Sequence, residues 1–236
     1  MTDWTDIEQA LSRALGLPRR PVAVAFRDTP PAGVAAFAGT EPSGCSFWRV
    51  AAGGRTFYTV PGDHHNCPIG SHTHAIPLPA ARASELGQTL GLMTRLGYVR
   101  MEEVPGIPVL ASTPAAVVYA PLGETPVDPD VVLVAGRPGR LMLLLEAAAR
   151  AGVSTRPGLL GRPTCMALPA ALAGGAVASA GCIGNRVYTD LGDDELYVAL
   201  PGRDVDRVAA ELTTIVAAND TLAAYHQDRR RTLATE

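Results

Sequence analysis

The chain has 236 residues, 47% of them hydrophobic, and a formal net charge of -3, and all 20 of its basic residues are arginines. A chain of this length can bury a substantial core. Its slightly negative net charge differs from the basic charge expected of a nucleic-acid-binding domain. Because it contains no lysine, it cannot form a lysine Schiff base or use a P-loop lysine. No apolar run reaches the roughly 20 residues that cross a bilayer, and the first residues lack the charged and apolar regions of a signal peptide. We therefore expect a soluble cytoplasmic protein that binds neither nucleic acid nor membrane.

The first half of the chain is expected to alternate short helices and strands. Apolar residues recur at helical spacing within residues 5–15, and proline and glycine mark residues 29–44 as a loop. The expected elements are helices over residues 5–15, 45–51 and 79–96, strands over residues 21–26 and 55–60, and an irregular or extended segment over residues 98–110. Ser43 is the expected N-cap of the helix that begins near Cys45. The histidine-rich stretch over residues 64–74 is expected to be a loop.

The second half continues the alternation, with longer apolar runs. Residues 131–135 are apolar throughout, as expected of a strand that is buried on both faces. The expected elements are strands over residues 116–120, 131–135, 176–182 and 196–200, a helix from Pro138 to Gly152, a loop over residues 158–163, a short helix from Cys165, and a final helix after Asp204. Together the halves predict an α/β or α+β fold in which helices flank a mixed sheet, within a single compact domain over residues 1–236.

The two halves share an ordered set of cysteines and glycines. Cys45 precedes Gly53-Gly54 and then Cys67-Pro68-Ile69-Gly70, and Cys165 precedes Gly174-Gly175 and then Cys182-Ile183-Gly184. An apolar strand lies upstream of each set. Because internal repetition dictates architecture, we expect two duplicated halves, about residues 17–110 and 111–218, related by a pseudo-twofold axis and followed by a C-terminal helix. The four cysteines would then gather near that axis.

The cysteines are candidate metal ligands. Disulfides are rare in the cytoplasm, and the thiolates of Cys45, Cys67, Cys165 and Cys182 would suit an iron–sulfur cluster or zinc. Cys45 and Cys165 are expected in the first turn of a helix, where amide groups and the helix dipole stabilise a thiolate. Cys67 and Cys182 are expected in loops that could turn backbone amides toward a ligand. No pair has the CxxC spacing of the common zinc and ferredoxin sites, so the hypothesis depends on the matched positions.

Three alternatives remain open for these residues. Free cysteines are often buried simply as small hydrophobic residues. The imidazoles of His64, His65, His72 and His74 could form a site with Cys67 for zinc, copper or haem, since His72 and His74 would face one side of an extended loop, or they could simply bond to backbone and water. Cys45 or Cys165 could also act as a nucleophile if its position lowers its pKa.

Two polar segments follow the second Ile-Gly pair. Asn185 and Arg186 could bind an anionic ligand, because the planar guanidinium suits carboxylate and phosphate, and a surface salt bridge is the alternative. The acidic turn that contains Asp190, Asp194 and Glu195 lacks the alternation of a calcium loop. We expect this turn to be solvated.

Several motifs together resemble one protein family, the uncharacterised prokaryotic group known as domain of unknown function 169. They are Ser43-Gly44-Cys45, Asn66-Cys67-Pro68-Ile69-Gly70, Val118-Tyr119-Ala120-Pro121-Leu122, Pro129-Asp130-Val131-Val132, Thr164-Cys165-Met166-Ala167, Cys182-Ile183-Gly184-Asn185-Arg186, Asp194-Glu195-Leu196 and Leu200-Pro201. The resemblance covers about residues 21–201 and implies a small soluble protein of bacteria or archaea, without implying an activity. The four cysteines fit the family pattern, whereas His72 and His74 lie outside it.

The leading hypothesis is a protein that binds a cysteine-ligated metallocentre, an iron–sulfur cluster, for redox or Lewis-acid chemistry on a small molecule. The alternatives are a non-enzymatic module that senses or delivers zinc, copper or haem through Cys67 and the histidines, and a thiol-nucleophile enzyme. A small-molecule ligand or a redox partner is expected, and a homo-oligomer remains open.

Overall fold

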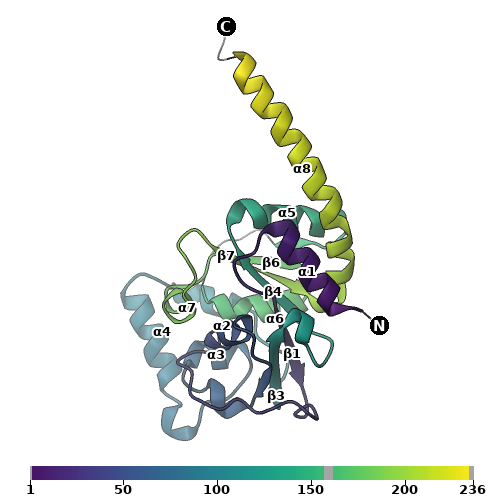
Figure 1. Cartoon of the computed structure of the whole chain (residues 1–236). Coiled ribbons are helices and arrows are strands. Elements are labelled where there is room, and N and C mark those ends of the chain that lie inside the picture. The colour runs from purple at the N-terminus through teal and green to yellow at the C-terminus, as the bar shows by residue number, and fades with distance from the viewer. Residues whose placement is uncertain (1, 157–161, 234–236) are drawn as a thin grey trace.

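The computed structural model describes residues 2–156 and 162–233. Seven strands form one mixed sheet in the order β2-β3-β1-β4-β7-β6-β5 (Figure 1). They are β1 (Val22–Arg27), β2 (Phe57–Thr59), β3 (Ala116–Pro121), β4 (Val131–Gly136), β5 (Thr155–Arg156), β6 (Ala176–Ser179) and β7 (Leu196–Pro201). Neighbouring strands are antiparallel except β5 and β6, which are parallel. The predicted mixed sheet is therefore confirmed, although the two-residue strand β5 was not predicted, and most of the loop expected over residues 158–163 lies outside the described residues.

The strand order is symmetric about the pair β1–β4. Reading outward, β3 and then β2 follow β1, while β7 and then β6 follow β4. The registers also correspond, because Val22 pairs with Pro121 where Val131 pairs with Pro201. The order, direction and register of β3 and β2 beside β1 thus resemble those of β7 and β6 beside β4, whereas β5 has no counterpart beyond β2.

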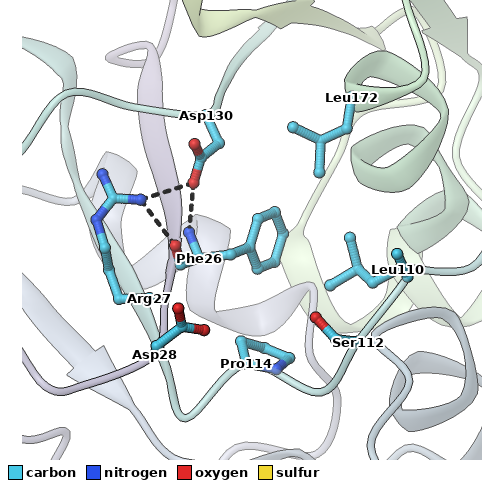
Figure 2. Close-up of a pocket in the computed structure, with 9 residues that line it drawn as sticks. Phe26, Arg27, Asp28, Leu110, Ser112, Pro114, Asp130 and Leu172 are labelled. Atoms are coloured by element: carbon cyan, nitrogen blue, oxygen red, sulfur yellow. Dashed lines mark hydrogen bonds and ion pairs between the residues drawn. The ribbon is translucent and has the colours of Figure 1, made fainter.

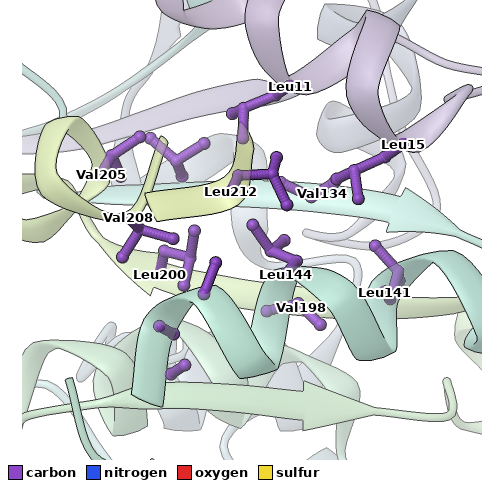
Figure 3. Close-up of a cluster of buried hydrophobic side chains, with 14 of the residues drawn as sticks. Leu11, Leu15, Val134, Leu141, Leu144, Val198, Leu200, Val205, Val208 and Leu212 are labelled. Atoms are coloured by element: carbon purple, nitrogen blue, oxygen red, sulfur yellow. The ribbon is translucent and has the colours of Figure 1, made fainter. Parts of the chain in front are cut away.

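Three helices pack on one face of the sheet. They are α1 (Trp4–Leu15), α5 (Pro138–Arg150) and α8 (Val205–Leu233). Leu11 and Leu15 of α1, Leu144 of α5 and Leu212 of α8 contribute to one buried apolar cluster, which Figure 3 shows against the strands. The apolar residues of α1 recur at helical spacing and form one stripe. The helix ends at Gly16, which adopts the left-handed conformation that favours glycine.

The C-terminal part of α8 extends beyond the body of the molecule (Figure 1). Its buried side chains all lie in its first turns, at Val205, Val208 and Leu212. Among the described residues, no helix combines the length and the apolar composition needed to cross a membrane.

The opposite face of the sheet is covered by α2 (Ser46–Ala52) and α6 (Ala167–Leu172). Because side chains alternate along a strand, Val131 and Leu133 of β4 face this side while Val132 and Val134 face α5. All six residues of β4 are buried, as predicted for a strand covered on both sides. The core here is aromatic, with the rings of Phe47, Phe57 and Tyr119 stacked or tilted against one another.

The histidine-rich stretch is helical, not a loop as expected. It forms the 3-10 helix η1 (Pro61–His64) and then α3 (Pro68–Thr73). A matching helix, α7 (Ile183–Thr189), begins directly after Cys182 and was not predicted. The segment expected as one helix over residues 79–96 instead forms η2 (Ala80–Arg82) and α4 (Glu85–Arg95), and α4 buries none of its side chains. The irregular segment that follows contains the 3-10 helix η3 (Met101–Gly106).

Candidate metal centre

Each cysteine lies at the start of a helix. Cys45 is the N-cap residue of α2, and Cys165 lies in the 3-10 helix η5 (Thr164–Met166), which leads into α6. Cys67 and Cys182 are the N-cap residues of α3 and α7, not loop residues as expected. Ser43 does not cap α2 as predicted, because its hydroxyl instead contacts the Cys45 thiol at 3.2 Å and the Ser46 hydroxyl.

The cysteines occupy matched places in the two halves of the sheet. Cys45 precedes Phe57 by as many residues as Cys165 precedes Val177, and these two residues pair with Tyr119 and Ala199 at equivalent positions of β3 and β7. The helices then cross between the halves, since α2 packs against α7 and α3 packs against η5. Each cysteine-bearing element of the first half therefore packs against one from the second half.

The four thiols lie within electrostatic range of one another. Burial, together with the charges of Cys182 and Cys67, raises the pKa of Cys45 to about 11. Burial also raises the pKa of Cys165, to which the charges of the other three cysteines add, and burial and Cys182 raise the pKa of Cys67. Every pair among the four therefore interacts, although the sequence separates them widely. The direction of these shifts is opposite to that of an activated thiol nucleophile.

Backbone amides surround two of the sulfur atoms. The Cys67 sulfur accepts the Gly70 amide at 3.2 Å, and the amides of Gly44 and Ile69 also lower the pKa of this thiol. The Cys182 sulfur accepts the Asn185 amide at 3.4 Å, in the same position relative to its helix. A Cβ atom on Gly70 would lie 3.2 Å from the Cys67 sulfur, so a larger residue here would require the Cys67 side chain to shift slightly. Such amides stabilise a thiolate once it forms.

Polar side chains beside the thiols have no hydrogen-bond partner among the described residues. The side-chain amide atoms of Asn185 and the hydroxyl of Tyr119 are buried and make no hydrogen bond of normal length and angle with a described residue, although Thr59 lies close enough to Tyr119 to lower its pKa. Asn185 lies close to Cys45 and lowers its pKa. Burial raises the pKa of Tyr119, and the charges of Cys45 and Cys165 raise it further. Buried polar groups without partners are rare and need an explanation. Here they are arranged around the sulfur atoms, where a bound group would satisfy them.

Two histidines form a buried pair beside this cluster. The ring centroids of His64 and His74 are 5.4 Å apart, the His64 Nε2 lies 2.8 Å from the Thr59 hydroxyl, and the His74 Nδ1 donates to the Gly70 carbonyl at 2.8 Å. The remaining ring nitrogens, His64 Nδ1 and His74 Nε2, are buried without a partner in the described structure. Burial lowers the pKa of His74 to about 4, and burial and the neighbouring His74 lower the pKa of His64 well below its usual value, so both rings are neutral near pH 7.

The other two histidines do not join this pair. His65 and His72 are half-buried, while His64 and His74 are almost fully buried. The expectation that His72 and His74 face one side of an extended loop is wrong, because α3 is helical and places His72 toward its outer side. The structure therefore separates the four histidines into two buried and two partly exposed rings.

Arg186 does not present its charge to a ligand. Its guanidinium donates to the backbone carbonyls of Gly192, Ala180 and Glu195 and so joins the two ends of the segment around α7. Glu195 is buried instead of solvated as expected, and its carboxylate accepts Arg19 at 2.7 Å and the Gly192 amide. Of the pair predicted to bind an anion, only Asn185 faces the candidate centre.

The donor set fits a metal that prefers sulfur. In the part of the chain that the structure describes, no three side chains of histidine, cysteine, aspartate or glutamate are positioned to hold a metal ion as they stand. Ligation by the cysteines therefore requires side-chain positions that differ from those described. The soft thiolate donors, the nearby amides and the unpaired Asn185 and Tyr119 are consistent with an iron–sulfur cluster or zinc.

Sequence reasoning missed several residues that shape this centre. Thr73 contacts the Cys165 thiol and lowers its pKa, and Tyr119 reaches the cluster from β3. Neither residue carries a sequence pattern that points to such a role, because both come from elements that meet the cysteines only in the fold.

Comparison with known proteins identifies the family. No curated protein and no solved structure matches the chain. The family model for DUF169, described as "Uncharacterised ArCR, COG2043", matches residues 10–211. This match covers most of the chain and includes all four cysteines and both buried histidines, so the protein belongs to the DUF169 family.

Proposed function

We propose that Cys45, Cys67, Cys165 and Cys182 bind an iron–sulfur cluster of the cubane type. The observation that carries the proposal is that the elements bearing these cysteines pack against one another, α2 against α7 and α3 against η5, although they are far apart in the sequence. When bound, such a cluster supplies electron transfer or a Lewis-acidic iron. The protein would use it for redox or Lewis-acid chemistry on a small molecule, together with a redox partner, in a reducing cytoplasm.

The electrostatics of the thiols support a site that ionises when it is filled. Burial and the neighbouring thiols raise the pKa of Cys45, Cys67 and Cys165 and so favour their protonated forms. A cation between them would replace their mutual repulsion by attraction and would release the thiol protons. The amides that point at Cys67 and Cys182 then stabilise the thiolates that form.

The unpaired polar atoms support a cluster more than a bare metal ion. An iron–sulfur cluster carries sulfide atoms that accept hydrogen bonds, and such bonds adjust its reduction potential. Asn185 and Tyr119 offer an amide and a hydroxyl that have no other partner among the described residues. We assign these two side chains to binding and adjusting the cluster, not to ligation.

The proposal includes an origin of the chain by internal duplication. The symmetric strand order and the matched positions of Cys45 and Cys165, and of Cys67 and Cys182, support two similar halves. Unrelated buried cysteines would have no reason to recur at equivalent helix starts. A centre shared by both halves explains why the pairs are matched.

Metal analysis of protein purified without oxygen tests the proposal. We expect a brown protein with about four iron and four sulfide atoms per chain. Replacing any one of the four cysteines by serine should lower the iron content and bleach the visible absorption. The control is Ser179→Ala, which alters a buried side chain on β6 close to Cys182 without removing a thiol. A folded protein that is colourless and metal-free would contradict the proposal, and stoichiometric zinc without iron would replace the cluster by a zinc site.

A further inference from the structure

A cavity opens beside the candidate centre, at the end of β1. It has a volume of about 290 Å³ and lies between β1, the loop before β3, the start of β4 and the end of α6. Figure 2 shows the side chains of Phe26, Leu110 and Leu172 turned toward one another on one side of it, with Arg27, Asp28 and Asp130 on the other. The cavity thus has an apolar wall and a charged wall.

The charged wall offers mainly hydrogen-bond acceptors. One oxygen of Asp130 accepts the Phe26 amide at 2.7 Å and the Arg27 guanidinium at 2.8 Å. Arg27 also donates to the carbonyls of Phe26 and Asp128, so its own donors are largely engaged. The other oxygen of Asp130 and both oxygens of Asp28 make no hydrogen bond or ion pair with any residue in the described ranges. Two carboxylates and one guanidinium leave this wall with an excess of negative charge.

The symmetry of the sheet shows that this space is specific to one half. Aligning β1 with β4 by their register makes Ala135 the equivalent of Phe26. Counting from the matched cysteines makes Ala52 the equivalent of Leu172. The cavity that Ala135 and Ala52 line also contacts Trp48 and holds only about 10 Å³, no more than one water molecule requires. The position equivalent to Trp48 is Leu168, a smaller side chain. The larger cavity is therefore not an obligatory consequence of the fold.

The cavity adjoins the thiols through a thin wall. The Phe26 ring lies 5.8 Å from the ring of buried His74, and the Leu110 amide donates to the Thr73 carbonyl at 2.9 Å. The Thr73 hydroxyl in turn faces Cys165. A molecule held in the cavity would therefore be separated from the centre by one layer of side chains.

We propose that this cavity binds a small organic ammonium compound with an apolar body. The ammonium group would lie between Asp28 and Asp130, where an ion pair would replace the solvent around the exposed Asp28 carboxylate and around the Asp130 oxygen that makes no hydrogen bond with a described residue. The apolar body would pack on Phe26, Leu110 and Leu172. This inference goes beyond the metal-binding function and does not depend on it, because none of these side chains is a proposed metal ligand.

Titration with two probes of the same shape and opposite charge tests the inference. The probes are 2-phenylethylammonium and 3-phenylpropionate, and binding to the full-length protein is followed through the amide NMR signals of Leu110 and Ser112. We expect the cation to shift both signals saturably and the anion to bind at least about tenfold more weakly. Equal binding of the two probes, or no saturable shift with either, would overturn the inference.

Two variants separate the charged wall from the apolar wall. Asp28→Asn should lower the affinity for the cation by about threefold, which is the effect of losing an exposed ion pair. Asp220→Asn, the same change on the exposed part of α8, should leave the affinity for the cation unchanged. Leu172→Trp should place an indole ring where the apolar body of the probe packs and so abolish measurable binding, while the thermal midpoint shows that the variant remains folded. Binding that survives Leu172→Trp would place the probe elsewhere and refute the assignment. Since the titration needs no metal, its result is independent of the iron content.

Discussion

Acid should destabilise the protein through His74, and the size of the effect follows from its burial. The pKa of His74 is lowered by burial to about 4, whereas an unfolded histidine titrates near its ordinary value. Above that ordinary value the ring is neutral in both states, and its full contribution to stability is present. As the pH falls toward the folded pKa, the unfolded chain binds a proton that the folded protein does not. Between pH 8 and pH 5 this difference should cost about 2 kcal/mol of unfolding free energy.

The assay compares the wild-type protein with His74→Gln, since glutamine can still donate to the Gly70 carbonyl but does not titrate. Urea unfolding at pH 8 and at pH 5 gives the free energy of each protein, and the wild type should lose about 2 kcal/mol more than the variant. His226→Gln is the control, because His226 is exposed on α8 and should lose as much as the wild type. The result that would refute the reasoning is an equal loss for wild type and His74→Gln, which would mean that the His74 ring reaches water in the folded protein.

Two matched pairs of substitutions test the packing of the sheet and its turns. Leu144→Ala should cost about 2–5 kcal/mol of unfolding free energy, because it leaves a void in the core, whereas Met142→Ala on the exposed side of the same helix should cost less than about 0.5 kcal/mol. Denaturant unfolding measures both, and similar losses would contradict the assignment of the buried face. Gly174→Ala should cost about 1–2 kcal/mol because its φ is +115° and nothing else crowds it. Gly175→Ala should cost clearly more, because its Cβ would also collide with the Ser154 carbonyl. A Gly175 variant as stable as the Gly174 variant would show that β5 can move away.

Local sequence patterns identified the regular elements that carry their own signal. The continuous apolar run of β4 predicted a strand buried on both faces, and helical spacing predicted α1 and α5. The short helices α3 and α7 were missed, because six or seven residues form a helix only with capping and tertiary contacts. Here the caps are the sulfurs of Cys67 and Cys182, which no propensity scale for serine or aspartate caps would indicate.

The candidate centre shows the same division. Its four cysteines were predicted from their repeated order along the chain. The role of Arg186 could not be predicted, because the three carbonyls that accept its guanidinium come from chain segments that meet only around α7. The burial of His64 and His74, in contrast to His65 and His72, likewise depends on packing against Phe47 and Phe26.

The sequence by itself determined the longer elements, because hydrophobic periodicity is a property of neighbouring residues, and it revealed the repeated order of the cysteines, because that order can be read along the chain. Only the tertiary structure decided that the elements bearing the cysteines pack against one another, since α2 contacts α7 and α3 contacts η5 across the antiparallel pair of β1 and β4. Such contacts join residues far apart in the chain, and their energies come from burial and packing that no local pattern contains.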